Sequence, residues 1–268
     1  MSGDNAIVVD RLSKDFRIYH EKSRLFSDHI GNTLLRRTKY DMLHVLRDIS
    51  FTVGKGEIIG VIGNNGAGKT TLLRIIAGII KPTSGNLMIN GKIIPFLGLG
   101  IGFNPDLTAI DNIVLYGIIL GFPKKEIAAK VPDVLAYAEL EKFADTKIRH
   151  FSAGMHARLA FATAVLVEPD ILLIDEVMGV GDISFRKKAY EAFLELINRE
   201  KTVVLVSHNL NKITEMCDRT ICLHNGQLHA IGKPEDVVKS YVELQQGLRM
   251  TNKRSGTPTE PSHVEEVE

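Results

Sequence analysis

A glycine-rich stretch, GNNGAGKT, occupies residues 63–70. Its two outer glycines, followed directly by Lys and Thr, have the spacing of a P-loop, in which backbone N–H groups surround phosphate oxygens. Lys69 would neutralise the β- and γ-phosphates of a nucleotide, and the Thr70 hydroxyl would bind Mg²⁺. A glycine-rich turn without a ligand is the alternative, but here an apolar run precedes the stretch and a helical pattern follows it. The predicted phosphate site consists of Gly63, Asn64, Asn65, Gly66, Ala67, Gly68, Lys69, Thr70 and Thr71.

A second candidate site lies at the end of the apolar run ILLIDE, residues 171–176. A buried strand would deliver Asp175 to its carboxyl end, where open α/β sheets bind ligands. Asp175 would then hold Mg²⁺, directly or through water, and Glu176 would activate a water molecule against the γ-phosphate. Taken alone, the run is equally consistent with a strand that merely ends in two acidic residues. The P-loop elsewhere in the chain favours the catalytic interpretation.

Short apolar runs alternate with helical patterns along much of the chain, and they would position these side chains. Runs that are apolar throughout are typical of strands in a parallel sheet covered on both faces. The alternation therefore predicts an α/β fold with a parallel sheet. Near the end, Asn225-Gly226 between two short runs predicts a β-hairpin. The expected strands are 6–10, 58–62, 171–175 and 203–207, and the expected helices between them include 70–80 and 184–199.

The middle of the chain has mostly helical patterns, which predict a helical subdomain inserted into the α/β core. We expect Pro132 to break the helix that begins near Lys124, because proline lacks the backbone N–H. From Thr251 onward the sequence is rich in Ser, Thr, Pro, Glu and Lys, which predicts disorder. The predicted boundaries are 1–102 and 167–245 for the core, 103–166 for the helical subdomain, and 251–268 for a disordered tail.

The composition is that of a globular protein and excludes several classes. The 268 residues contain 33 basic and 32 acidic side chains, a formal net charge of +1, so no overall field attracts nucleic acid. The two cysteines, Cys217 and Cys222, provide neither a disulfide framework nor a metal-binding pair, which favours a reducing compartment. No long apolar run predicts a signal peptide or a membrane span.

Three further motifs follow the P-loop in a characteristic order. FSAGM at 151–155 precedes a helical pattern, Asp182 lies in GVGD soon after the acidic pair, and His208 ends the run VVLVSH. Together with the P-loop, they resemble the nucleotide-binding subunits of ABC transporters over residues 1 to about 245. The resemblance implies a P-loop NTPase (RecA-like) parallel-sheet core with an N-terminal antiparallel β portion and an inserted helical subdomain.

The resemblance also implies a head-to-tail homodimer that holds two ATP molecules and Mg²⁺ between its subunits. The signature of one subunit would face Lys69, Thr70 and Asp175 of the other, and a helix N-terminus there favours phosphate. Glu176 and His208 would be catalytic, with Asp182 beside the nucleotide. Adenine would stack on Phe16, or alternatively on Tyr19, although either could be an ordinary packing residue. The signature residues would be Ser152, Ala153, Gly154 and Met155.

Within this family, three stretches resemble the subunits that export lipid-linked polysaccharides of the O-antigen, capsule or teichoic acid type. They are SAGM followed by Ala157-Arg158-Leu159, DEVMGVGD at 175–182, and LGLGIGFNPDLTAIDNI at 97–113. ATP hydrolysis would then drive export through a separate integral membrane permease dimer, with this subunit peripheral on the cytoplasmic face of the bacterial inner membrane. Alternatives are an exporter of a drug, lipid or peptide, a soluble ABC ATPase acting on ribosomes or DNA, and a nonhydrolysing regulatory subunit. One P-loop and a near-neutral charge argue against a nucleic-acid partner.

Two features depart from the wider family. No Gln or Glu lies between Gly91 and Asn104, and Gly98 stands where the polysaccharide group often has Glu, so we expect no side-chain Mg²⁺ ligand there. Residues 20–44 form a basic insertion in which Ser23 would cap a helix. That helix would contact the transport partner or anionic headgroups, or would simply pack on its own domain.

Overall fold

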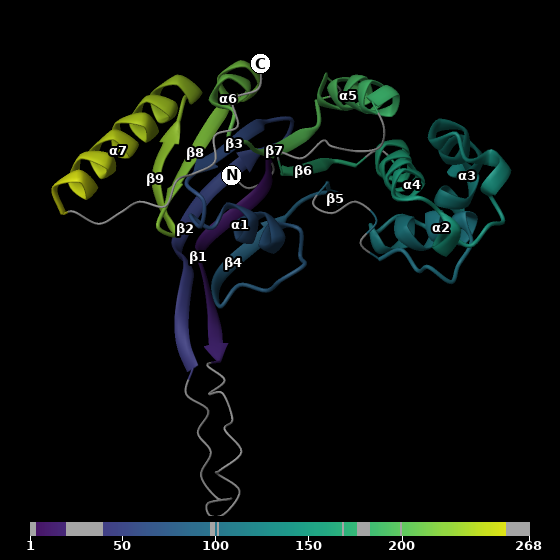
Figure 1. Ribbon diagram of the computed structural model, residues 1–268, viewed down its shortest axis with the longest axis horizontal. Helices are drawn as coiled ribbons and strands as arrows, with labels where there is room; N and C mark the ends of the chain where they lie inside the picture. The colour runs from purple at the N-terminus through teal and green to yellow at the C-terminus, as the bar shows by residue number, and fades with distance from the viewer. Residues whose placement is uncertain are drawn as a thin grey trace, which may run out of the picture.

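The computed structural model describes residues 4–19, 40–96, 100, 102–167, 169–175, 183–198 and 200–255. Figure 1 shows a central body of strands and helices, a group of helices beside it, and a two-stranded ribbon that projects away from both. Within the described part of the chain, no helix is both long and apolar enough to cross a membrane.

The larger sheet has six strands in the order β5-β6-β7-β3-β8-β9. All neighbouring pairs are parallel except β8 and β9, which are antiparallel. The strands are β3 (Ile58–Gly63), β5 (Ile93–Pro95), β6 (Ile171–Asp175), β7 (Thr202–Val206), β8 (Arg219–His224) and β9 (Gln227–Gly232). The β8–β9 turn has positive φ at both Asn225 (49°) and Gly226 (77°), the geometry that favours Asn-Gly in a two-residue hairpin.

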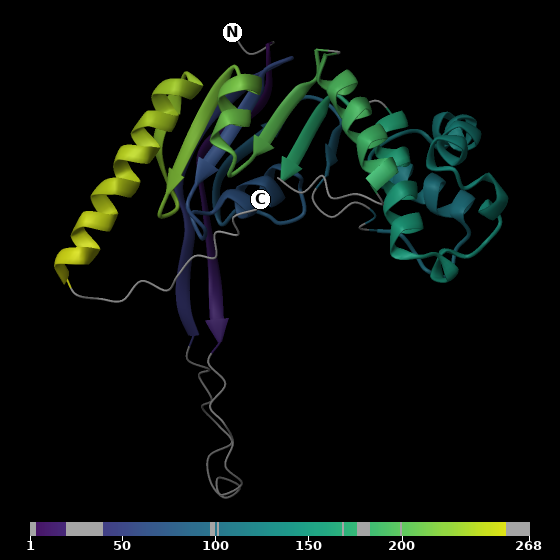
Figure 2. The same cartoon turned by 45° about the horizontal axis from the view of Figure 1, so that its top comes forward.

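Alternate residues of the central strands pack into two different cores, which explains why their sequences are apolar throughout. On β6, Ile171 and Leu173 join the core that includes α1 (Lys69–Ile76), whereas Leu172 and Ile174 join the core with the other helices. The helices of that second core include α5 (Ile183–Asn198), α6 (Leu210–Met216) and α7 (Pro234–Ser255). Figure 2 shows α7 running along β9 at one side of the sheet. The predicted α/β fold with a parallel sheet is confirmed.

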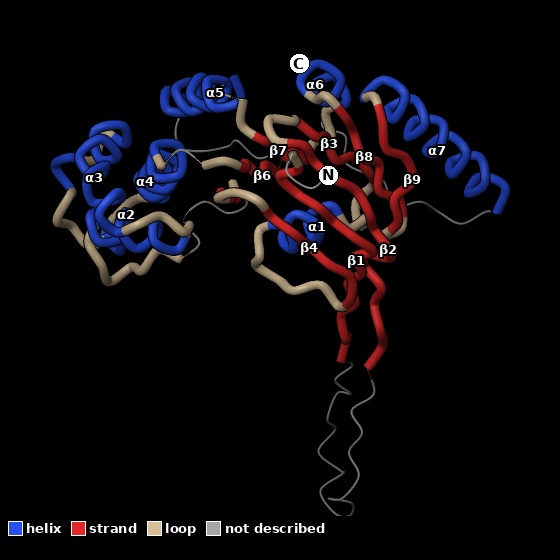
Figure 3. Tube along the Cα trace, turned by 180° about the vertical axis from the view of Figure 1, so that it is seen from behind, coloured by secondary structure: helices blue, strands red, loops and turns tan. Residues whose placement is uncertain are grey.

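A smaller antiparallel sheet has the order β2-β1-β4, from β1 (Asn5–Tyr19), β2 (Tyr40–Gly54) and β4 (Ser84–Ile89). Strand β4 pairs with β1 only as far as Ser13, so the rest of β1 and its partner on β2 continue alone as the ribbon seen in Figure 3. Residues 40–44 are therefore strand, and their placement in a helical insertion is wrong. Cross-strand pairs of large apolar side chains such as Phe16 with Leu43 favour the extended conformation. Residues 20–39 lie outside the described residues.

The helical group consists of α2 (Ala109–Ile119), α3 (Lys124–Ala138) and α4 (Ala153–Leu166), with 3₁₀ turns at Glu141–Phe143 and Ile148–His150. The expected break at Pro132 is wrong, because α3 continues through it. Buried residues lie on both sides of the proline, including Ile127 and Leu135, and their packing offsets the lost backbone hydrogen bond.

The C-terminal boundary also differs from the prediction. Helix α7 continues to Ser255, so residues 251–255 are helical and not part of a disordered tail. Once a helix is nucleated, each added residue gains a backbone hydrogen bond, and α7 is nucleated by turns that pack on the core through Val237. Residues 256–268 lie outside the described part of the chain.

Candidate nucleotide site

The P-loop joins the end of β3 to the start of α1 and folds tightly around its own carbonyl groups. The Asn64 carbonyl accepts from the Ala67 N–H at 3.1 Å and from Lys69 Nζ at 3.0 Å. Lys69 Nζ also donates to the Gly63 carbonyl at 2.6 Å, and its side chain is buried. No side chain caps the first turn of α1 at Gly68. This arrangement places a cation and the N-terminus of a helix at one loop, the combination that binds phosphate.

The backbone geometry of the loop requires glycine at Gly63 more strictly than at Gly66. At Gly63, where φ is 148°, an added Cβ would lie 2.3 Å from the Leu223 carbonyl oxygen of β8. At Gly66, where φ is 78°, nothing lies within 4 Å of an added Cβ. Strand β8 would therefore have to move to accept a side chain at Gly63, whereas Gly66 would suffer only the strain of a positive φ.

We expect Gly63→Ala to lower the free energy of unfolding by about 3 kcal/mol, because a sheet carbonyl cannot move aside cheaply. Gly66→Ala, the matched control, should cost about 1 kcal/mol from backbone strain alone. Urea unfolding followed by circular dichroism measures both. Equal losses in the two variants would contradict the close approach of β8.

Asp175 ends β6 and meets the P-loop helix. Thr70 Oγ1 donates to Asp175 Oδ2 at 3.3 Å, which joins two hard oxygen atoms from elements 105 residues apart. Oxygen atoms of this kind are the ligands that Mg²⁺ prefers, and Mg²⁺ usually takes only one or two from the protein. Among the described residues, no cluster of three or more His, Cys, Asp or Glu side chains forms a metal site. Glu176 follows Asp175 directly but lies outside the described residues, as do Asp182 and Gly98.

His208 follows β7, which lies between β3 and β6 in the sheet. The backbone on the C-terminal side of His208 is fixed by a hydrogen bond, because Ser207 Oγ accepts from the Asn209 N–H at 3.1 Å. Asn209 in turn caps α6 by accepting from the Lys212 N–H at 3.1 Å. The carboxyl end of β7, which precedes His208, therefore lies between the carboxyl end of β3, which leads into the P-loop, and that of β6, which carries Asp175.

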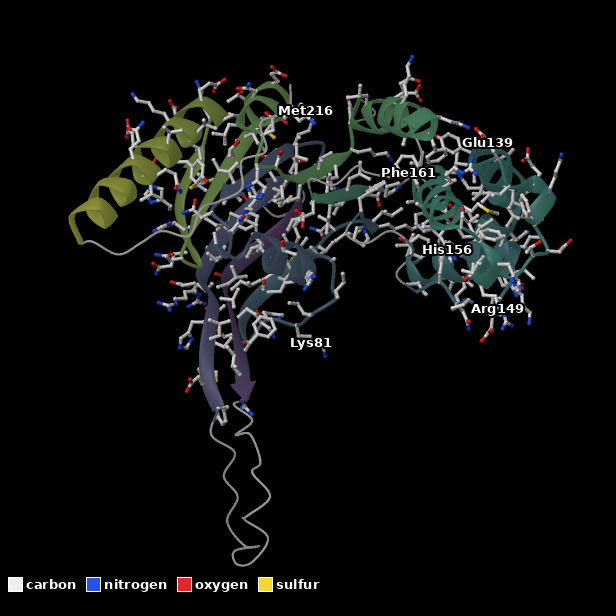
Figure 4. All side chains as sticks on the ribbon, in the orientation of Figure 1. Lys81, Glu139, Arg149, His156, Phe161 and Met216 are labelled. Atoms are coloured by element: carbon white, nitrogen blue, oxygen red, sulfur yellow. The ribbon has the colours of Figure 1, made fainter. Side chains whose placement is uncertain are left out.

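The predicted signature forms the N-terminus of α4. Ser152 is the N-cap, with its Oγ accepting from the Met155 N–H at 3.2 Å, and Ala153 and Gly154 lie between them in the first turn. In Figure 4, His156, which directly follows the signature, lies within the helical group, while α1 lies in the central body. Within one chain, the signature and the P-loop therefore occupy different parts of the molecule.

Comparison with known proteins identifies this combination of motifs. Residues 46–179, which contain the P-loop, the signature and Asp175, match the family described as ABC transporter. The chain belongs to this family. Its members are ATP-binding subunits that hydrolyse ATP, and this ABC transporter subunit is accordingly an ATPase.

Individual relatives cover nearly the whole chain. The O-antigen export system ATP-binding protein RfbB of Myxococcus xanthus is 41% identical over 97% of this chain, which spans 60% of that relative's length. The teichoic acids export ATP-binding protein TagH of Staphylococcus haemolyticus is 33% identical, and the match covers 92% of each chain. A solved structure, described as an ATP binding subunit of an ABC transporter, has a TM-score of 0.65 at 26% identity and covers 88% of this chain and 93% of its own.

Phe16, the predicted adenine-stacking residue of this ABC transporter subunit, lies on the two-stranded ribbon, near the end of the ribbon that adjoins the P-loop. Phe16 is 38% exposed, and Lys14 Nζ lies 4.9 Å from the centre of its ring. Lys14 pairs with Leu46, and a Cβ on Gly68 would lie only 2.6 Å from Leu46 Cδ2. Phe16 is two residues farther along β1, whereas Tyr19, the alternative, ends the strand.

Two residues that contact the P-loop were missed by the sequence analysis. Tyr241 and Gln245 of α7 both donate to the Asn64 side-chain oxygen, the former at 3.0 Å. They carry no motif, and their only signal is the four-residue spacing that places them on one face of a helix.

Proposed function

We propose that the protein is the ATP-hydrolysing subunit of an ABC exporter that moves a lipid-linked polysaccharide through a separate membrane permease. The ATPase activity in this proposal is supported above all by the contact between Thr70 and Asp175 beside Lys69. This contact brings phosphate-binding and metal-binding groups together at the carboxyl ends of the parallel strands. The substrate class is supported by relatives named for O-antigen and teichoic acid export. The transported glycan is accordingly of the O-antigen, capsule or teichoic acid type.

In this proposal each functional group of the site has a distinct role in binding or hydrolysing ATP. Backbone N–H groups of the loop and of the first turn of α1 that make no bond within the loop bind the phosphate oxygens, and Lys69 moves from the loop carbonyls to the β- and γ-phosphates. The hydroxyl of Thr70 and the carboxylate of Asp175 fit Mg²⁺, which when bound would neutralise charge on the phosphates. Glu176 accepts the proton of the attacking water, and His208 donates to the γ-phosphate.

Two subunits act together in the proposed mechanism. The exposed N-terminus of α4 is separated from the P-loop of its own chain, so a second copy would have to supply the signature to each nucleotide. In a head-to-tail homodimer, Ser152, Ala153, Gly154 and Met155 of one copy would meet ATP bound to the other, with Asp182 between the copies. Phe16 would stack on the adenine ring, which its partly exposed face permits.

The subunit is proposed to act on the cytoplasmic face of the inner membrane, held there by the permease dimer. An exporter of a drug, small lipid or peptide is the second candidate, but the two relatives described above are named for O-antigen export and teichoic acids export. No nucleic-acid partner is proposed, because the formal charge is only +1.

Co-purification from membranes tests the transport assignment. Tagged Glu176→Gln protein with ATP is expected to retain the permease together with a lipid-linked glycan, because bound ATP would persist without hydrolysis. Lys69→Ala protein is the matched control, since it should lose ATP and release the complex. Protein analysis and glycolipid analysis are read on the same eluate. A permease recovered with a peptide or drug load would replace the polysaccharide assignment, and recovery of ribosomes would remove transport altogether.

A further inference from the structure

Helix α7 reaches the P-loop at the side chain of Asn64. Tyr241 Oη donates to Asn64 Oδ1 at 3.0 Å, and Gln245 Nε2 donates to the same oxygen. The two donors lie four residues apart and hence on one face of the helix. An amide oxygen has two acceptor positions, so these bonds use its full capacity and fix the orientation of the Asn64 side chain.

Asn64 is also the residue on which the loop itself is organised. Its carbonyl oxygen accepts from the Ala67 N–H and from Lys69 Nζ, as described above. One residue therefore receives two bonds from within the loop through its backbone and two from α7 through its side chain. A rotation of the Asn64 peptide would disturb both sets, because its backbone and side chain share one Cα.

The base of α7 is firmly placed, so it can serve as a fixed reference for the loop. Val237 is buried in the main core, and Tyr241 packs against the same core. The helix also packs on α6, β8 and β9, and Figure 2 shows it alongside these strands. Burial raises the pKa of Tyr241, so its hydroxyl keeps the proton that it donates to Asn64.

We propose that Asn64, Tyr241 and Gln245 form a polar clamp by which helix α7 holds the P-loop in its phosphate-binding conformation, so that the position of α7 sets the affinity for ATP. Tyr241 and Gln245 are positioning residues, since they act on the nucleotide only through Asn64. Coupling of this kind is reciprocal, so ATP binding must also stabilise α7. The proposal goes beyond the ATPase role, because it gives the C-terminal helix control over nucleotide binding.

The clamp is tested with Tyr241→Phe/Gln245→Met in the full chain, a pair that keeps the ring and the length of each side chain but removes both donors. Loss of two hydrogen bonds should raise the Kd for a fluorescent ATP analogue roughly five- to thirtyfold. The KM for ATP should rise by the same factor, while kcat at saturating ATP stays within about twofold of the parent. Slower hydrogen exchange of α7 amides on ATP addition is expected in the parent and not in the variant.

Ser240→Ala is the matched control. It removes the contact of Ser240 Oγ with His229 Nε2 at 3.2 Å, which ties α7 to β9 without involving the P-loop. Its Kd for the ATP analogue should equal that of the parent. An unchanged Kd in the double variant would overturn the clamp, and so would an equal rise in Ser240→Ala, which would indicate general loosening of α7. If the double variant does not fold, Tyr241→Phe alone should give about a fivefold rise, judged by the same criteria.

Discussion

Lys69→Ala is expected to lower kcat/KM for ATP by about a hundredfold or more. In the proposed function Lys69 is the cation at the β- and γ-phosphates, and electrostatic groups aimed at developing charge typically contribute this much. The lysine is buried and donates to two loop carbonyls, so alanine would also release the Gly63 and Asn64 carbonyls from their shared donor. Phosphate release with a coupled assay measures the loss.

Lys125→Ala is the control for charge alone, because Lys125 is exposed on α3 in the helical group. It removes the same formal charge and should leave ATP hydrolysis unchanged. Near-parental phosphate release from Lys69→Ala would mean that the loop binds phosphate without its lysine, which would contradict the role given to it.

Asp175→Asn is expected to lower kcat about a hundredfold while leaving the fold and Mg²⁺-free ATP binding intact. The amide oxygen of asparagine can still accept from Thr70, so the 3.3 Å contact is preserved. The negative charge that would attract Mg²⁺ is lost, and oxygen ligands without charge hold this ion weakly. Steady-state hydrolysis over a series of Mg²⁺ concentrations measures the effect, which higher Mg²⁺ should relieve in part.

Asp170→Asn is the matched control, because Asp170 directly precedes β6 and so lies beyond the end of the strand opposite Asp175. Asp170 accepts from the Lys92 N–H at 2.8 Å, so its substitution tests loss of a carboxylate beside β6 that is remote from the P-loop. Its Mg²⁺ dependence should equal that of the parent. An Asp175→Asn variant with full activity at ordinary Mg²⁺ would remove Asp175 from the metal site.

The strands that position the site could be predicted because they are buried on both faces. Successive side chains of β6 point into two different cores, so none of them can be polar. They are Ile171, Leu172, Leu173 and Ile174. The P-loop could be predicted for a related reason, since its glycines meet a geometric demand that few other residues satisfy. The contact between Thr70 and Asp175 follows from these two elements once the strand order is known.

The errors occurred where tertiary contacts override local preference. Pro132 costs α3 one hydrogen bond, but the sequence does not reveal that residues on both sides of it are buried. Residues 40–44 pair with β1 across a long gap in sequence, and no local pattern reveals that pairing. The Asn64 clamp has the same origin, because Tyr241 is 177 residues away and belongs to no motif.

The ribbon formed by the outer parts of β1 and β2 has a mechanical consequence. Strand β2 continues unbroken from the ribbon to Leu46, which touches Gly68 of the P-loop, and the Arg47 N–H donates to the Gly226 carbonyl at 2.7 Å. From Tyr40 to Val45 an extended strand measures about 17 Å. The ribbon therefore acts as a lever arm. A force applied to it near Tyr40 would exert a torque at Leu46 and Arg47, the point where β2 lies between the P-loop and the β8–β9 turn.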